Sequence, residues 1–401
     1  MSLVAEYLTK NIKPSPTLAV AAKATELKAQ GHPVINLGVG EPDFDTPENI
    51  KLAAINAINK GYTKYTPVGG VKALKEAIVN KFKRENNLEY SLNEVFASCG
   101  AKQTIYNAMM ASINPGDEVI ILAPYWVSYV DIVKIAGGIP VIVESDINNN
   151  FALKVDAIEK AITAKTKWIF LNSPSNPCGV VYSHQELRAL ADILLKNEHV
   201  YVLSDDIYEH LVYDHTKFYT IAAVEPLLKN RVLTVNGVSK TYSMTGWRIG
   251  YCGGPLELIK AMDIIQSQST SNPCSISQMA AIEALNGPQD FIKANNKIFS
   301  NRRDIVVKSL NETPGLKCAV PHGAFYVFFD CSALFGKQTA TGKILRTSDD
   351  VATYFLEQFY VAIVAGSSFG IEGYCRISYA LSNSDIIEAC QRIRNACELL
   401  K

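Results

Sequence analysis

The middle of the chain alternates short apolar runs with longer segments of helical periodicity, and this pattern constrains the fold more than any other feature. In the segment 184–196, apolar side chains recur at the spacing of one helix face, at Leu187, Leu190, Ala191 and Leu194. Strands that alternate with helices predict an α/β fold with a mainly parallel sheet. The predicted strands are Val119–Leu122, Pro140–Val143, Trp168–Leu171, Val200–Leu203 and Val232–Val235.

Three of these predicted strands run directly into polar, turn-rich stretches. The stretches are NSPSNPCG, SDDIYEH and NGVSK, and they carry Asn176, Asp205 and Lys240. Open α/β sheets bind ligands in the crevice beyond the carboxyl ends of their strands. We therefore expect these three side chains to face one common crevice.

Lys240 lies in the stretch VSKTYSMTGWRIGYCGGP, eight residues before Arg248. An unperturbed lysine, with a pKa of about 10.4, is protonated at neutral pH and is a poor nucleophile. Desolvation or a neighbouring positive charge lowers that pKa, and such lysines form Schiff bases with carbonyl compounds, pyridoxal phosphate (PLP) among them. A PLP site would also need a phosphate-binding arginine and helix N-terminus, a carboxylate for the ring nitrogen and a stacking partner.

The sequence offers a candidate for each of these needs. Arg248 and the helix start at Gly100 suit phosphate, Asp205 suits the ring nitrogen, and Trp126 of APYWVSY offers a flat aromatic face. Taken singly, each has an ordinary alternative: a solvated lysine, a turn after a strand, or a core tryptophan. One ligand accounts for all of them together.

Composition and charge exclude several other classes of function. Lysine plus arginine and aspartate plus glutamate number 39 each, so no global field favours nucleic acid or an anionic membrane. No apolar run approaches the roughly 18 residues of a membrane span. The nine cysteines lack CxxC spacing and the six histidines lack metal-binding spacing. We expect a cytoplasmic enzyme with reduced thiols, no metal and small-molecule partners.

The chain changes in character after about residue 288. The predictions here are a helix over 289–311, strands at Ala324–Phe329, Val361–Val364 and Cys375–Tyr379, a surface loop over 332–350, and a final helix over 384–400. We interpret the segment as a smaller α+β domain. The predicted divisions are an N-terminal arm and part of the small domain (1–45), a large domain (46–290) and a small C-terminal domain (291–401).

Eight motifs in this order resemble signatures of one family: GVGEPDFDTP, GYTKYTPVGG, GAKQ, APYWVSY, NSPSNPCG, SDDIYEHL, SKTYSMTGWRIGY and YCRISYA. From Gly38 to about Ala380 the chain resembles the class I aminotransferases, PLP-dependent enzymes of fold type I. The resemblance implies a large, mainly parallel sheet domain with a smaller α+β domain. It also implies PLP as cofactor and a homodimer whose active sites are shared between subunits.

The resemblance assigns a role to each matching residue. Lys240 would form the Schiff base with PLP and carry the proton, while Asp205 and Tyr208 complete the catalytic set. Besides Lys240 and Asp205, the residues implied to hold the cofactor are Asn176 and Tyr208 at the phenolic oxygen and Trp126 against the ring. At the phosphate they are Gly100, Ala101, Lys102 and Arg248 of the same subunit, with Tyr65 of the partner subunit. Where many relatives have a phosphate-binding serine, this chain has Gly237, and Ser239 is the candidate to replace it.

For the substrate, Arg376 would bind the α-carboxylate with help from Asn176, Trp126 and the backbone of Gly40. Lys102 would pair with the distal carboxylate of an acidic amino acid, although it could instead bind phosphate or face solvent. Lys13 lies where bacterial relatives carry a basic residue on a lid. The expected reaction is ping-pong transfer from L-aspartate to 2-oxoglutarate, giving oxaloacetate and L-glutamate, with prephenate as a further acceptor that gives arogenate.

Other activities remain open at the level of sequence. An aminotransferase for alanine or aromatic amino acids, or a carbon–sulfur lyase of the same fold, would keep the lysine, the aspartate and the arginine. A lyase would release pyruvate and ammonia without a keto acid. A PLP-bound sensor domain normally carries a DNA-binding module, for which the sequence shows no basic footprint.

Overall fold

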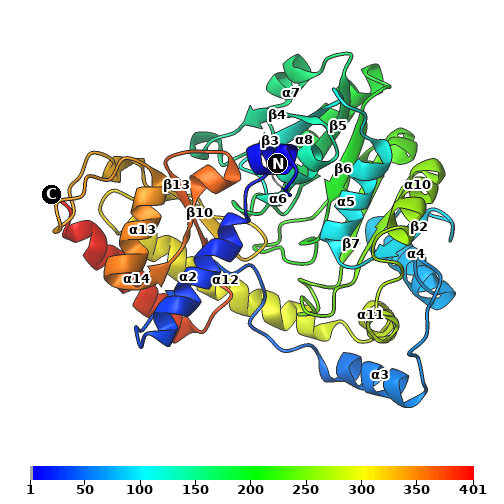
Figure 1. Ribbon diagram of the computed structural model, residues 1–401, viewed down its shortest axis with the longest axis horizontal. Helices are drawn as coiled ribbons and strands as arrows, with labels where there is room; N and C mark the ends of the chain where they lie inside the picture. The colour runs from blue at the N-terminus through cyan, green and yellow to red at the C-terminus, as the bar shows by residue number, and fades with distance from the viewer. Residues whose placement is uncertain (1–2) are drawn as a thin grey trace.

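A mixed seven-stranded sheet forms the centre of the larger lobe in the computed structural model, which describes residues 3–401 (Figure 1). The strand order is β2-β8-β7-β6-β5-β3-β4; β3 to β7 are mutually parallel, and β8 is antiparallel to both β7 and β2. The strands are β2 (Val95–Ser98), β3 (Glu118–Ala123), β4 (Ile139–Glu144), β5 (Thr166–Asn172), β6 (Tyr201–Asp205), β7 (Val232–Gly237) and β8 (Gly250–Gly253). All five predicted parallel strands are confirmed.

Helices cover both faces of this sheet because its buried strands are apolar on both sides. Along β5, Ile169 and Leu171 face one layer, whereas Trp168 and Phe170 face the other. The first layer contains α4 (Lys72–Asn86), α7 (Val155–Ala161), α8 (His184–Lys196) and α11 (Ser275–Asn286), with α3 (Glu48–Asn59) packed on α11. The second contains α5 (Ala101–Ser112), α6 (Ser128–Ile135) and α10 (Leu256–Ser267).

The smaller lobe contains a four-stranded antiparallel sheet of order β12-β13-β10-β9. Its strands are β9 (Lys317–Cys318), β10 (Tyr326–Asp330), β12 (Val364–Ala365) and β13 (Tyr374–Ser378). Around it lie α12 (Asp290–Asn311), α13 (Ser348–Phe359) and α14 (Asn383–Glu398). The short elements elsewhere are α1 (Glu6–Asn11), α9 (Ile221–Val224) and 3₁₀ turns at Ile147–Asn149, Pro226–Arg231, Ser332–Leu334 and Gly366–Phe369.

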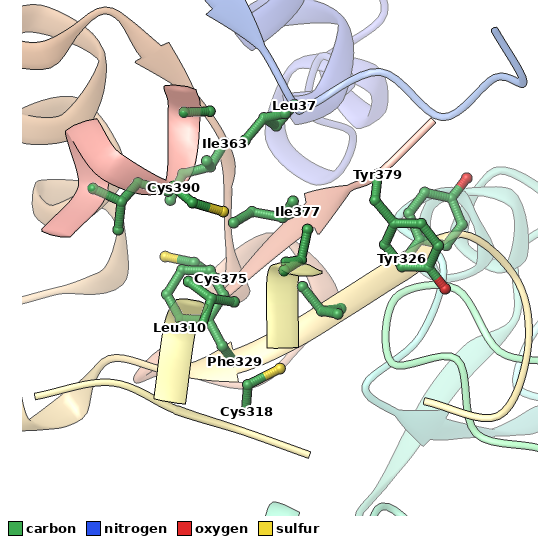
Figure 2. Close-up of a cluster of buried hydrophobic side chains, with 14 of the residues drawn as sticks. Leu37, Leu310, Cys318, Tyr326, Phe329, Ile363, Cys375, Ile377, Tyr379 and Cys390 are labelled. Carbon is green, nitrogen blue, oxygen red and sulfur yellow. The ribbon is translucent and has the colours of Figure 1, made fainter. Parts of the chain in front are cut away.

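Residues 16–37 of the N-terminal segment pack into the smaller lobe. Strand β1 (Ile35–Asn36) pairs in parallel with β11 (Val361–Ala362), and α2 (Pro16–Ala29) packs beside them. Leu37 enters the same core as Ile377 and Phe329, as Figure 2 shows. Residues more than 300 positions apart therefore share one core. The boundaries at 45/46 and 290/291 stay a prediction.

Two details of the C-terminal prediction are wrong. The strand predicted at 361–364 divides into β11 and β12, which belong to different sheets. The predicted surface loop over 332–350 ends in the first turn of α13, where Thr347 and Asp350 form a capping box. Leu334 and Leu345 in that stretch are fully buried, so the segment is anchored in the core although its sequence is polar.

Within residues 3–401, no helix is long and apolar enough to cross a membrane. All nine cysteines lie in this described part of the chain, and each is a free thiol.

Candidate active site

A cavity of about 480 Å³ lies where the carboxyl ends of the parallel strands meet the smaller lobe. Strands β5 and β6 end at it with Asn172 and Asp205, and Lys240 follows β7 into it. The smaller lobe contributes Tyr326 and Arg376. Of the site residues predicted from sequence, those that line the cavity are Gly40, Ala101, Lys102, Trp126, Asn176, Asp205, Tyr208, Ser239, Lys240, Arg248 and Arg376.

Lys240 lines the cavity and is held by the loop that follows β1. Its Nζ donates to the Gly40 carbonyl over 2.6 Å. Burial is the main cause that lowers the pKa of Lys240 to about 8; the charges of Arg248 and Arg376 also lower it, and Glu41 opposes them. A substantial fraction of this amine is therefore neutral near pH 7.5, as a nucleophile requires.

Asp205 presents an unsatisfied acceptor to the cavity. Its Oδ2 accepts from the Tyr129 hydroxyl over 2.5 Å, whereas Oδ1 is buried and has no hydrogen-bond partner among residues 3–401. Burial raises the pKa of Asp205 to about 6, in spite of the bond from Tyr129. A buried acceptor without a donor costs free energy, so the site suits a ligand that brings a donor, above all a cationic one.

The N-terminus of α5 and Arg248 form an anion-binding cradle. Gly100 precedes the helix with φ +90°, and a Cβ there would lie 2.1 Å from Nη2 of Arg248. A Cβ on Gly250 would lie 2.1 Å from the Ala101 nitrogen, so only glycine allows this close approach. Free backbone N–H groups and a guanidinium on one side of the cavity suit phosphate. Gly100 supports the cradle from behind and does not itself line the cavity.

Gly237 lies behind the cavity lining. A Cβ there would lie 2.9 Å from the Ile207 side chain and 3.1 Å from the Ile249 carbonyl, so a serine would crowd the backbone of the neighbouring strand. Ser239 lines the cavity two residues later. Its role in place of a serine at 237 stays a prediction.

Arg376 is a buried cation whose hydrogen-bond partners among residues 3–401 include no carboxylate. Its Nη1 donates to Oδ1 of Asn176 over 2.9 Å and its Nη2 to the Gly38 carbonyl over 2.6 Å. The guanidinium lies between the rings of Tyr326 and Phe369, 4.7 and 4.9 Å from their centroids. Nε has no partner among residues 3–401. Burying an unpaired cation is costly, so the arrangement fits an anionic ligand such as a carboxylate.

Two aromatic side chains complete the cavity wall. The Tyr208 hydroxyl lies 2.9 Å from the Tyr326 hydroxyl, and burial raises the pKa of Tyr208 well above its usual range. Trp126 packs edge-on against Tyr129, with ring centroids 5.3 Å apart. Nζ of Lys102 lies 4.9 Å from the Trp126 ring centre, and burial lowers the pKa of Lys102.

Besides Gly100, two predicted residues do not line the cavity. Tyr65 is 91% exposed, and its predicted role requires a second subunit. Lys13 is exposed between α1 and α2, whereas Thr17 and Leu18 of α2 do line the cavity.

Sequence reasoning missed three residues that shape the site. Asn172 bonds to the backbone of two site residues. Its Nδ2 donates to the Asp205 carbonyl over 2.9 Å, and its Oδ1 accepts from the backbone N–H of Asn176 over 2.8 Å. Its position at the end of a predicted strand could have identified it. Tyr129 lies inside APYWVSY, but nothing local shows that it reaches Asp205. Tyr326 lies in an apolar strand and carries no sequence signal.

The comparisons with known proteins agree on one family. The model described as "Aminotransferase class I and II" matches residues 32–393. A "Probable aspartate/prephenate aminotransferase" of Rickettsia felis is 58% identical over 397 residues, 99% of this chain and 97% of the relative. An "Aspartate aminotransferase" of Rhizobium meliloti (strain 1021) is 55% identical over 386 residues, 96% of this chain and 94% of the relative.

Solved structures show the same similarity. The crystal structure of the aspartate aminotransferase from Rhizobium meliloti covers 100% of both chains with a TM-score of 0.96 and 53% identity. The aspartate aminotransferase from Thermus thermophilus with maleate covers 99% of this chain and 100% of the other, with a TM-score of 0.92 and 40% identity.

Proposed function

Because the chain belongs to the class I and II aminotransferases, we propose that it uses PLP to transfer the amino group of L-aspartate to 2-oxoglutarate. Prephenate is proposed as a further acceptor, in line with the names of two Rickettsia relatives, 58% and 57% identical to this chain. One observation carries the proposal. The cavity places a lysine of lowered pKa together with a carboxylate oxygen that lacks a donor, an anion-binding cradle and a buried arginine without a carboxylate partner.

The residues present fit PLP. The free Oδ1 of Asp205 suits the protonated ring nitrogen, and the α5 N-terminus with Arg248 suits the phosphate. Asn176 and Tyr208 would serve the phenolic oxygen, and Trp126 would stack on the ring. When bound, PLP supplies an electron-withdrawing ring that accepts the electron pair left as the substrate Cα loses its proton.

The chain's own groups bind the substrate and move the proton. The guanidinium of Arg376 would hold the α-carboxylate through two parallel hydrogen bonds, which fixes the direction of the Cα–H bond. Nζ of Lys240 would remove the Cα proton and later return one. A pKa of about 8 suits this exchange, because the amine can hold or release a proton near neutral pH.

We further propose a homodimer. Large apolar side chains are exposed on and just after α3, namely Leu52, Ile55, Ile58, Tyr62 and Tyr65. A second copy would cover this face and bring Tyr65 of the partner subunit to the phosphate. A cytoplasmic location stays a prediction from the cysteine pattern.

Product analysis tests the reaction and its alternatives. The purified protein with PLP, L-aspartate and 2-oxoglutarate should form oxaloacetate and L-glutamate, and arogenate when prephenate replaces 2-oxoglutarate. Alanine and phenylalanine should be much poorer donors. Release of pyruvate and ammonia without any keto acid would instead identify a lyase.

Lys102→Met should selectively weaken acidic substrates. Removing the cation should raise the KM for aspartate by roughly tenfold, about 1.4 kcal/mol, and leave that for alanine nearly unchanged. Steady-state kinetics with both donors measures this, and Lys72→Met, which removes an exposed lysine, is the matched control. An equal loss for both donors would assign Lys102 to phosphate binding instead.

The pH dependence of PLP binding should report the lowered pKa of Lys240. Only the neutral amine attacks the aldehyde, so the rate of covalent binding to the apoprotein should rise with pH and level off above about 8. Stopped-flow absorbance measures the rate, with Lys240→Ala as the control without covalent binding. A rate that keeps rising to about pH 10 would indicate an ordinary solvated lysine.

A further inference from the structure

A buried polar network lies outside the cavity, next to the chain segments that carry Tyr208 and Lys240. It consists of Lys81 and Asn86 on α4, Glu209 after β6, and Asn236 on β7. None of the four lines the cavity. Lys81 is 0% exposed and Glu209 is 5% exposed, so their ion pair is removed from water. Lys81 also lies 3.6 Å from Glu85, whose carboxylate contacts His210.

Glu209 is the centre of this network. Its Oε1 accepts from Nζ of Lys81 and, over 2.8 Å, from Nδ2 of Asn236. Its Oε2 accepts from Nδ2 of Asn86 over 2.6 Å. Lys81 also donates to Oδ1 of Asn86 over 2.7 Å. The charge of Lys81 keeps the pKa of Glu209 below its usual value in spite of complete burial.

Stability alone gives little reason for such a pair. Removing two charges from water costs several kcal/mol, and apolar residues of similar volume often serve stability as well or better. A fully bonded buried pair does fix geometry, because moving any member leaves a buried polar group without its partner.

The geometry that Glu209 fixes is that of the two chain segments carrying the reactive side chains. Glu209 directly follows Tyr208, and Asn236 precedes Lys240 by four residues, so the bond between them links these segments. A second link joins the same two segments, between Nδ1 of His210 and Oγ1 of Thr241 over 3.2 Å. Tyr208 and Lys240 thus line the cavity, while residues close to them in sequence are bonded to one another outside it.

We propose that Glu209, held by Lys81, is a positioning residue that sets the Tyr208 hydroxyl relative to the Lys240 amine. The proposal rests on the proposed function, in which that hydroxyl donates to the phenolic oxygen of PLP. Tyr208 also contacts Tyr326 of the smaller lobe, and without the network this contact would be its main polar restraint.

The test compares two double variants of the full chain. Lys81→Met/Glu209→Leu removes every polar bond of the pair, whereas Lys81→Met/Glu209→Gln removes the charges but keeps an oxygen for Asn236. With PLP bound, the Leu variant should show its pH-dependent absorption change about one pH unit higher than the unmodified chain, because the phenolic oxygen loses a donor. Its kcat should fall about tenfold with less than a twofold change in KM, and the Gln variant should recover most of both.

Arg303→Met is the matched control for loss of a buried cation, since Arg303 pairs with Asp214 and neither residue lines the cavity. This substitution should lower the melting temperature without moving the midpoint of the pH-dependent absorption change.

Identical midpoints and kcat values in the Leu and Gln variants would overturn the proposal. If the Leu variant does not fold, Asn236→Ala decides, because it removes the bond between Glu209 and the Lys240 segment. An unmoved midpoint overturns the proposal, and an upward shift supports it. Failure of the proposed function would differ, because the unmodified chain would then show no PLP absorption.

Discussion

Lys240→Ala should lower the rate of transamination by on the order of 10⁴-fold or more. The substitution removes both the amine that bonds PLP and the base that moves the Cα proton. The other lysine that lines the cavity, Lys102, has its Nζ near the Trp126 ring and lacks the bond to the Gly40 carbonyl that positions Lys240. Single-turnover kinetics with L-aspartate measures the loss.

As controls for this substitution, PLP binding and the melting temperature of the variant are measured. The variant should bind PLP without a covalent bond, through the cradle of Arg248 and the α5 N-terminus, and should keep its melting temperature within a few degrees. A transamination rate within tenfold of that of the unmodified chain would assign the proton transfer to another residue.

Arg376→Met should lower kcat/KM for aspartate and for 2-oxoglutarate by roughly 10³-fold, about 4 kcal/mol. It removes the buried cation and leaves Oδ1 of Asn176 and the Gly38 carbonyl without their donor. Arg376→Lys should recover only part of the loss, because an ammonium keeps the charge but cannot form two parallel bonds to a carboxylate. Steady-state kinetics with both substrates measures the effect.

An amine that lacks a carboxylate provides the matched substrate control. Its slow reaction should be nearly equal in the unmodified chain and in Arg376→Met, since the arginine has nothing to bind. An equal loss for this amine would show that Arg376 supports the structure of the site rather than the substrate.

The parallel sheet and the crevice could be predicted from sequence because both depend on local patterns. The strands at 168–171 and 232–235 are short apolar runs, and polar residues follow each of them. Since parallel strands align their carboxyl ends, Asp205 and Lys240 had to lie near one another. Arg376 of β13 could be assigned to the site only through the family resemblance.

Other features depend on contacts between distant segments, which local patterns do not encode. The unsatisfied Oδ1 of Asp205 exists because Tyr129, from α6, satisfies only the other oxygen. The burial of Leu334 and Leu345 in a polar stretch depends on the core of the smaller lobe. The ion pair of Lys81 and Glu209 joins positions 128 residues apart.

The absorption spectrum of the purified PLP-bound protein, before and after L-aspartate without any keto acid, tests the central proposal most directly. Loss of the band of lysine-bound PLP, with the band of pyridoxamine phosphate in its place, is the expected result. It would establish the cofactor, the lysine and the acidic donor together. A band that persists with aspartate but falls with alanine or phenylalanine would contradict the assigned substrate. Absence of any PLP band in protein supplied with PLP would contradict the assignment of Lys240 itself.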